Sequence, residues 1–154
     1  MKIAQIISNT ITTGGAYGNK TTGGSGRIAV VESWGFFIGN TFNDRKYRPV
    51  FIPRANRERD QLEFQTPVDD VPVRFFANSS QGWIPFGMLH DLIDTTEPPI
   101  TGVVDNVANY TISGIFSGFN ANSTTVPTLR DQILGNNGNS QAAQVNQLVT
   151  SYRW

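Results

Sequence analysis

One apolar run constrains this sequence more than any other stretch: residues 26–42 read GRIAVVESWGFFIGNTF, with turn-forming residues on both sides. In an extended chain, Ile28 and Trp34 lie on one face, while Val31 and Phe37 lie on the other. A strand that is apolar on both faces is typical of the centre of a sandwich or barrel, where it is covered on both sides. The run therefore predicts a central β-strand.

The composition favours the same fold class. Charged residues make up 16% of the 154 positions, aromatic residues make up 11%, and Gly, Thr and Asn are abundant. This combination indicates short strands and many turns rather than helices rich in Ala, Glu and Lys. The sequence thus predicts a mainly β protein: one antiparallel sandwich or barrel, with a jelly-roll-like arrangement possible, and one or two short C-terminal helices.

Further elements follow from local patterns of β-branched residues, glycine and proline. Besides the central run, strands are expected at 2–13, 47–52, 62–65, 72–77, 100–107 and 109–119. An irregular apolar segment is expected at 83–89, and a single helical turn within 90–99. Helices are expected at 127–134 and from Ser140, as the cap, to Tyr152. The predicted organisation is a β-rich domain at 1–135 with a flexible glycine-rich loop at 14–26, then a hinge and helical tail at 136–154.

Charge and cysteine content exclude several classes of function. The formal net charge is zero, so no global field attracts nucleic acid or an acidic membrane. The chain has no cysteine, which excludes disulfides, thiolate metal sites and cysteine nucleophiles. The N-terminus is too short and polar for a signal peptide, and no apolar run reaches membrane-spanning length. We expect synthesis in a cytoplasm without a signal peptide and, for a viral protein, incorporation into the virion.

Two motifs suggest chemistry without completing it. Gly18-Asn19-Lys20-Thr21 echoes the end of a phosphate-binding loop, but Asn19 stands where that loop needs glycine before lysine. His90, the single histidine, has i, i+4 spacing to Asp94, so a metal site there stays open. No serine lies in a nucleophile-elbow context that would use His90 in a triad. We predict no catalytic residue, cofactor or metal ligand, and expect His90 to cap or line the edge of the core.

Half of the twelve basic residues lie within fifteen positions: Arg45, Lys46, Arg48, Arg54, Arg57 and Arg59. A first interpretation is a phosphate- or nucleic-acid-binding patch, which the zero net charge disfavours. A second is that this cluster meets the acidic segment at 69–105, within one subunit or between neighbours, and so fixes orientation. A third is a solvated loop with no role.

The sequence favours an assembly protein over an enzyme. A neutral, Asn- and Thr-rich β-domain has the character of virion capsid, decoration, vertex or tail proteins, whose partners are copies of themselves and other assembly proteins. The basic cluster, Tyr152 and Trp154 are the predicted interface residues, because a terminal tryptophan gains by docking. The alternative is a carbohydrate- or ligand-binding β-module that uses Tyr17, Trp83 and Trp154. An enzyme ranks third, and a small-molecule ligand is not indicated.

Overall fold

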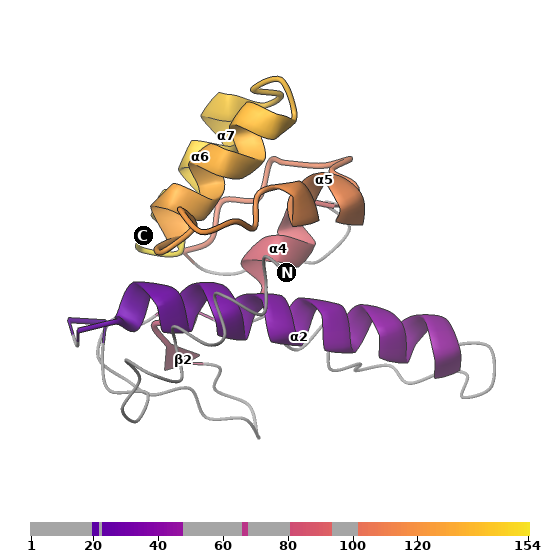
Figure 1. Ribbon diagram of the computed structural model, residues 1–154, viewed down its shortest axis with the longest axis horizontal. Helices are drawn as coiled ribbons and strands as arrows, with labels where there is room; N and C mark the ends of the chain where they lie inside the picture. Colours follow the sequence, from indigo (N-terminus) through magenta and orange to yellow (C-terminus); the bar gives the residue numbers. More distant parts are fainter. Residues whose placement is uncertain (1–19, 22, 48–65, 68–80, 94–101) are drawn as a thin grey trace.

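The structure is a computed structural model that describes residues 20–21, 23–47, 66–67, 81–93 and 102–154, and 57% of this part is helical. Its helices are α2 (Ser25–Tyr47), α4 (Met88–Asp91), α5 (Ile112–Ser117), α6 (Val126–Asn136) and α7 (Ala142–Ser151). Two-residue strands β1 (Thr66–Pro67) and β2 (Gln81–Gly82) pair in parallel. The group formed by α4 to α7 lies on one side of the long helix α2 (Figure 1).

The prediction of a mainly β sandwich or barrel, jelly roll included, is wrong for the part of the chain that the structure describes. The central run at 26–42 is helical and lies within α2, and the strand predicted at 109–119 contains α5 instead. Residues 103–107 and 109–111, predicted to lie in strands, have no regular secondary structure. The strands predicted at 2–13, 62–65 and 72–77, and nearly all of 47–52, lie outside the described residues.

The error at α2 has a physical cause. When apolar residues lie on every face of a segment, they fit the two-residue period of a strand and the 3.6-residue period of a helix equally well. Periodicity therefore does not discriminate between a strand and a helix here. Length does, because strands usually run four to eight residues, whereas α2 has 23 residues and a length of about 35 Å. No helix in the described ranges, α2 included, is both long and apolar enough to be a candidate membrane span.

The two C-terminal helices agree with the predicted ones, and local sequence explains where α6 begins. The Thr125 side chain accepts from the Thr128 amide, and the Thr128 hydroxyl accepts from the Thr125 amide, which completes a capping box. Pro127 stands in the first turn, where its missing N–H has no cost. The cap of α7 differs from the prediction: Gln141, at φ 54°, takes that position in place of Ser140.

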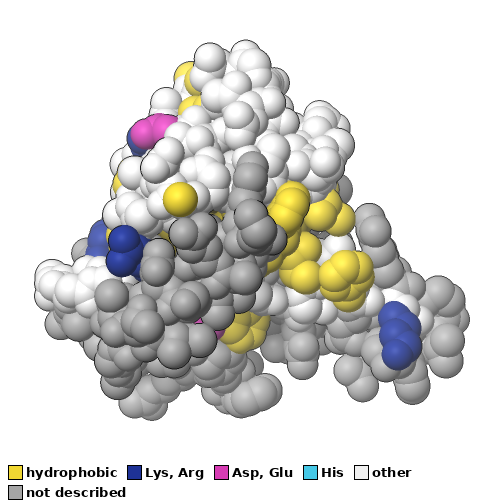
Figure 2. Space-filling view, viewed as in Figure 1, with side chains coloured by type: hydrophobic (Ala, Val, Ile, Leu, Met, Phe, Trp, Pro, Cys, Tyr) yellow, Lys and Arg dark blue, Asp and Glu magenta, His cyan; other side chains and the backbone are white. Residues whose placement is uncertain are grey.

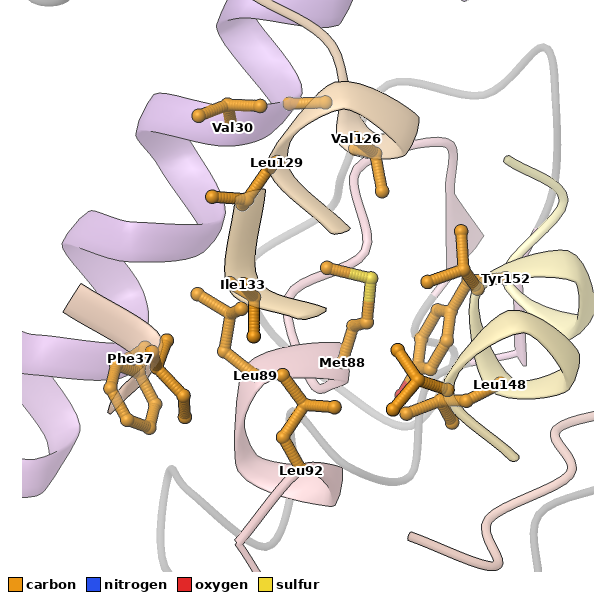
Figure 3. Packing of buried hydrophobic residues seen from close by; sticks show 14 of the residues in the cluster. Val30, Phe37, Met88, Leu89, Leu92, Val126, Leu129, Ile133, Leu148 and Tyr152 are labelled. Atoms are coloured by element: carbon orange, nitrogen blue, oxygen red, sulfur yellow. The ribbon is translucent and has the colours of Figure 1, made fainter. Parts of the chain in front are cut away.

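The core forms where the helices meet around α4, which lies between α2 and α7 (Figure 3). Phe37 of α2, Leu89 of α4, Ile133 of α6 and Leu148 of α7 are all buried and belong to one apolar cluster. The irregular apolar segment predicted at 83–89 is present and buried, and its last two residues begin α4.

Helices α5 and α6 approach closely at Gly118, the cap residue that follows α5. A Cβ atom added to Gly118 would lie 3.0 Å from the backbone nitrogen of Ile133 and closer still to the Ile133 side chain. Backbone atoms cannot move aside as a flexible side chain can, so this position admits only glycine at the present helix spacing. The contact holds the C-terminal end of α5 against the C-terminal half of α6.

Candidate association surface

Helix α2 presents one exposed stripe although most of its surface is covered. Gly35, Gly39, Phe42 and Lys46 are exposed and follow one another at helical spacing, with half-buried Glu32 one turn before them. These five residues are called the α2 stripe below. Because the rest of the described part of α2 is buried or half-buried, the stripe is where this helix can contact something beyond its own subunit.

Within the part of the chain that the structure describes, the two glycines of the stripe pack against no other side chain or backbone. A Cβ atom at Gly35 or Gly39 would meet nothing within 4 Å, whereas one at Gly26 would lie 2.9 Å from the Thr124 carbonyl oxygen. Glycine inside a helix costs about 1 kcal/mol relative to alanine. Gly26 recovers that cost through close packing, and Gly35 and Gly39 do not. The close approach of another subunit would offset the cost of Gly35 and Gly39 in the same way.

Exposed aromatic side chains stand beside the glycines. Phe42 is 61% exposed and Phe116 of α5 is 44% exposed, and these two are the large apolar side chains most open to solvent in the described part. The Phe116 ring lies 5.5 Å from that of Trp34, which in turn lies 4.6 Å from Phe119. Figure 2 shows apolar side chains gathered where α5 faces the C-terminal half of α2.

The charges of the α2 stripe are opposite at its two ends. Glu32 stands at the N-terminal end and Lys46 at the C-terminal end, fourteen positions away (46 − 32), which is about 21 Å along a helix. Gly39 lies midway between them in the sequence. The stripe is therefore complementary to itself in an antiparallel arrangement, because a two-fold rotation about Gly39 exchanges the positions of the acid and the base.

Two polar residues of α4 lie buried within the core. His90 and Asp91 are each 4% exposed, and the Tyr152 hydroxyl donates to Asp91 Oδ2 at 2.7 Å. The His90 ring contacts the Phe37 ring at 4.8 Å between centroids. His90 was expected at the edge of the core and instead lies inside it. Asp94 lies outside the described residues, and within them no three side chains of His, Cys, Asp or Glu form a metal-binding group.

The two predicted aromatic platforms are used inside the subunit. Trp83 is 2% exposed, and the Trp154 indole N–H donates to its carbonyl at 2.9 Å. The Lys20 ammonium lies 4.8 Å from the centroid of the Trp154 ring and also donates to the Arg153 carbonyl. Trp83 is therefore closed to solvent, Trp154 is half-buried with Lys20 over its ring, and Tyr17 lies outside the described residues. This arrangement disfavours the carbohydrate-binding interpretation.

Among the predicted interface residues, Lys46 is exposed on the α2 stripe, and Tyr152 is 2% exposed, with its hydroxyl bound to Asp91. The side chain of Arg45 is outside the description, and Arg48, Arg54, Arg57 and Arg59 lie outside the described residues altogether. Sequence reasoning missed the glycines and Phe42. The signal was present, since positions 35, 39, 42 and 46 share one face of a helix, but the strand interpretation separates them.

No protein-family model, curated protein or solved structure matches this chain. Inference about its function therefore rests on the geometry of the α2 stripe and its surroundings.

Proposed function

We propose that this chain is a structural subunit of a symmetric assembly, and that its elementary contact is a two-fold pairing of α2 with the α2 helix of a second copy. The observation that carries the proposal is the self-complementarity of the α2 stripe. With the two helices antiparallel and crossing at Gly39, Glu32 of each copy stands opposite Lys46 of the other. A two-fold interface uses the same patch on both subunits, so such a patch must complement itself.

Each part of the stripe contributes a different effect. The bare backbone at Gly35 and Gly39 lets a second helix come close, as small residues do in tightly crossed helix pairs. Phe42 loses most of its exposure on pairing, and covering such a side chain contributes about 1.5–3 kcal/mol. The two charge pairs fix an antiparallel orientation more than they add affinity, because a parallel pair would place like charges together.

The remaining support is compositional. Zero net charge leaves little long-range repulsion between copies, which suits the close packing of many subunits. The likeness to virion proteins depends on a β-domain, and the helical fold of the described part removes that premise. A virion component is one class of symmetric assembly that the proposed pairing fits, and an image of the native particle would test that class separately.

Light scattering coupled to size-exclusion chromatography of the full chain tests the pairing. We expect a dimer or larger species whose fraction rises with concentration. Gly39→Leu fills the crossing point and is expected to give a monomer. The matched control is Gly135→Leu on α6, which is also an exposed helical glycine with nothing within 4 Å. A monomer at all concentrations, or equal behaviour of the two leucine variants, would refute the proposal.

A charge exchange tests the antiparallel geometry. Glu32→Lys and Lys46→Glu each place like charges opposite one another, so each single variant should associate more weakly than the parent chain. The double variant restores two attractive pairs with the signs reversed and should recover association. Circular dichroism of all three variants verifies that α2 remains folded. Additive weakening in the double variant would contradict an interface in which these two residues face one another.

A further inference from the structure

The side chain of Asn137 joins α5 to the end of α6. Its amide nitrogen donates to the Ile133 carbonyl at 2.7 Å and to the Gly114 carbonyl at 3.1 Å. Asn137 is also the C-cap of α6, where its backbone N–H bonds the carbonyls of Ile133 and Leu134. Both amide hydrogens are therefore used, one within α6 and one on α5. This pair of side-chain hydrogen bonds is called the Asn137 clasp below.

Glycine at position 114 makes the clasp possible. A Cβ atom there would lie 2.5 Å from Asn137 Oδ1, too near for any side chain to fit without displacing the amide. Gly114 thus leaves space for the Asn137 amide beside α5. The clasp depends on two backbone carbonyls and on the absence of a side chain at Gly114, and a carboxylate cannot replace the amide because it has no N–H to donate.

The residue after Asn137 is glycine, and this is the one Asn-Gly step in the sequence. Gly138 has φ 65°, and with no side chain it offers the least hindered backbone nitrogen for attack on the preceding amide. In that reaction the deprotonated Gly138 nitrogen bonds to Asn137 Cγ, the Cγ–Nδ2 bond breaks, and ammonia leaves. Water then opens the cyclic imide to aspartate or isoaspartate. The balance is asparagine plus water giving aspartate plus ammonia.

We propose that Asn137 is a site of spontaneous deamidation whose rate is set by the Asn137 clasp. While the clasp is closed, two carbonyl oxygens hold the amide and restrain Asn137 Cγ from turning toward the Gly138 nitrogen. Two hydrogen bonds of typical strength slow the reaction about thirty-fold relative to the unfolded chain. The product carboxylate faces the carbonyl oxygens of Ile133 and Gly114 without a proton to share. The clasp therefore does not close again, and α5 is loosened from α6.

The test incubates the full chain at mildly alkaline pH, once folded and once in urea, and follows each asparagine by peptide mass spectrometry and enzymatic isoaspartate labelling. Asn136 and Asn139 flank the site and serve as internal controls, because asparagine and serine follow them. We expect Asn137 to convert faster than either neighbour in urea, and about thirty-fold more slowly in the folded chain than in urea.

A substitution separates the effect of the clasp on the deamidation rate from the effect of the Asn-Gly sequence. Gly114→Ala displaces the Asn137 amide and should speed conversion in the folded chain while leaving the rate in urea unchanged. Circular dichroism verifies that this variant folds. If the variant does not fold, the comparison of rates in the folded and urea-unfolded parent chain still tests the proposal. Equal rates for the parent chain folded and in urea would overturn the proposal. Conversion of Asn137 in urea at the rate of Asn136 and Asn139 would overturn it as well.

Discussion

The indole N–H of Trp154 donates a hydrogen bond to the backbone carbonyl of Trp83 at 2.9 Å, across 71 positions of the sequence. The two rings lie 6.3 Å apart, and the Lys20 ammonium lies over the Trp154 ring. The Ser25 hydroxyl in turn donates to the Lys20 carbonyl at 2.5 Å, which links this contact to the start of α2. The C-terminal tryptophan therefore joins three parts of the fold.

Replacing this tryptophan should destabilise the fold. Trp154→Ala removes the hydrogen bond to Trp83, the ring contact and the cation–π interaction with Lys20, at a combined cost of about 2 kcal/mol. Trp154→Phe keeps a ring and loses the N–H donor, so it should cost about 1 kcal/mol. Urea denaturation followed by circular dichroism measures both values. An unchanged midpoint in the alanine variant would show that the contact is energetically neutral.

The stability of the chain should fall at alkaline pH through Tyr110. The Tyr110 side chain is 6% exposed and its hydroxyl donates to the Ser140 carbonyl, and desolvation raises the pKa of Tyr110 above its ordinary value. Because the folded pKa is the higher one, the stabilisation is present below the unfolded pKa of about 10 and is lost as pH rises through the folded pKa.

Tyr110→Phe removes this titration. At neutral pH the variant should be less stable by about 1 kcal/mol, because the Ser140 carbonyl loses its donor. Between about pH 9 and pH 11 its urea midpoint should decline less steeply than that of the parent chain. Parallel declines in the two proteins would assign the alkaline loss of stability to other groups.

Two glycine-to-alanine changes should act in opposite directions. Gly118→Ala forces a methyl group against Ile133 and should cost about 1–3 kcal/mol as α5 and α6 move apart. Gly135→Ala adds a methyl group in open space on α6 and should stabilise the helix by up to about 1 kcal/mol. Thermal unfolding of the two variants compares them directly. A neutral Gly118→Ala would mean that the helix spacing relaxes easily.

The capping box at the start of α6 predicts a graded series at one position. Thr125→Val keeps the shape and loses the hydroxyl that accepts from the Thr128 amide, at a cost of about 1 kcal/mol. Thr125→Ser keeps the hydroxyl, so any loss there reports the methyl group, which contacts the Gly26 region of α2. Chemical denaturation orders the three proteins. A valine variant as stable as the serine variant would contradict the role of the cap.

Sequence reasoning succeeded where local chemistry decides the structure. The Pro127 signal located α6, and the helical spacing of Val145, Leu148 and Tyr152 located α7, because caps and amphipathic spacing act within a few residues. It failed at α2, where apolar residues cover every face and the period carries no information. The length of the apolar run was the signal that indicated a helix there, but the composition, which favoured strands, was given more weight.

The candidate surface was harder to predict than the helices. Gly35 and Gly39 gain meaning only after α2 is known to be a helix and the space around each glycine is known. Trp154 was expected to dock on something, and it does so within its own subunit. Which partner a half-buried aromatic side chain such as Trp154 contacts depends on long-range packing, which local patterns do not encode. The positions of the charged residues were visible in the sequence, but the geometry in which those residues could pair was not.

The closely packed glycines also restrict which substitutions related sequences can tolerate. Gly26 faces the Thr124 carbonyl and Gly118 faces the Ile133 backbone, and in both places a single added carbon has no room. Descendants that keep this helix arrangement must inherit both glycines, while exposed Gly35 and Gly39 are free to drift unless a partner holds them. A comparison of how much these four positions vary among related sequences would therefore show whether selection for self-association acts on Gly35 and Gly39.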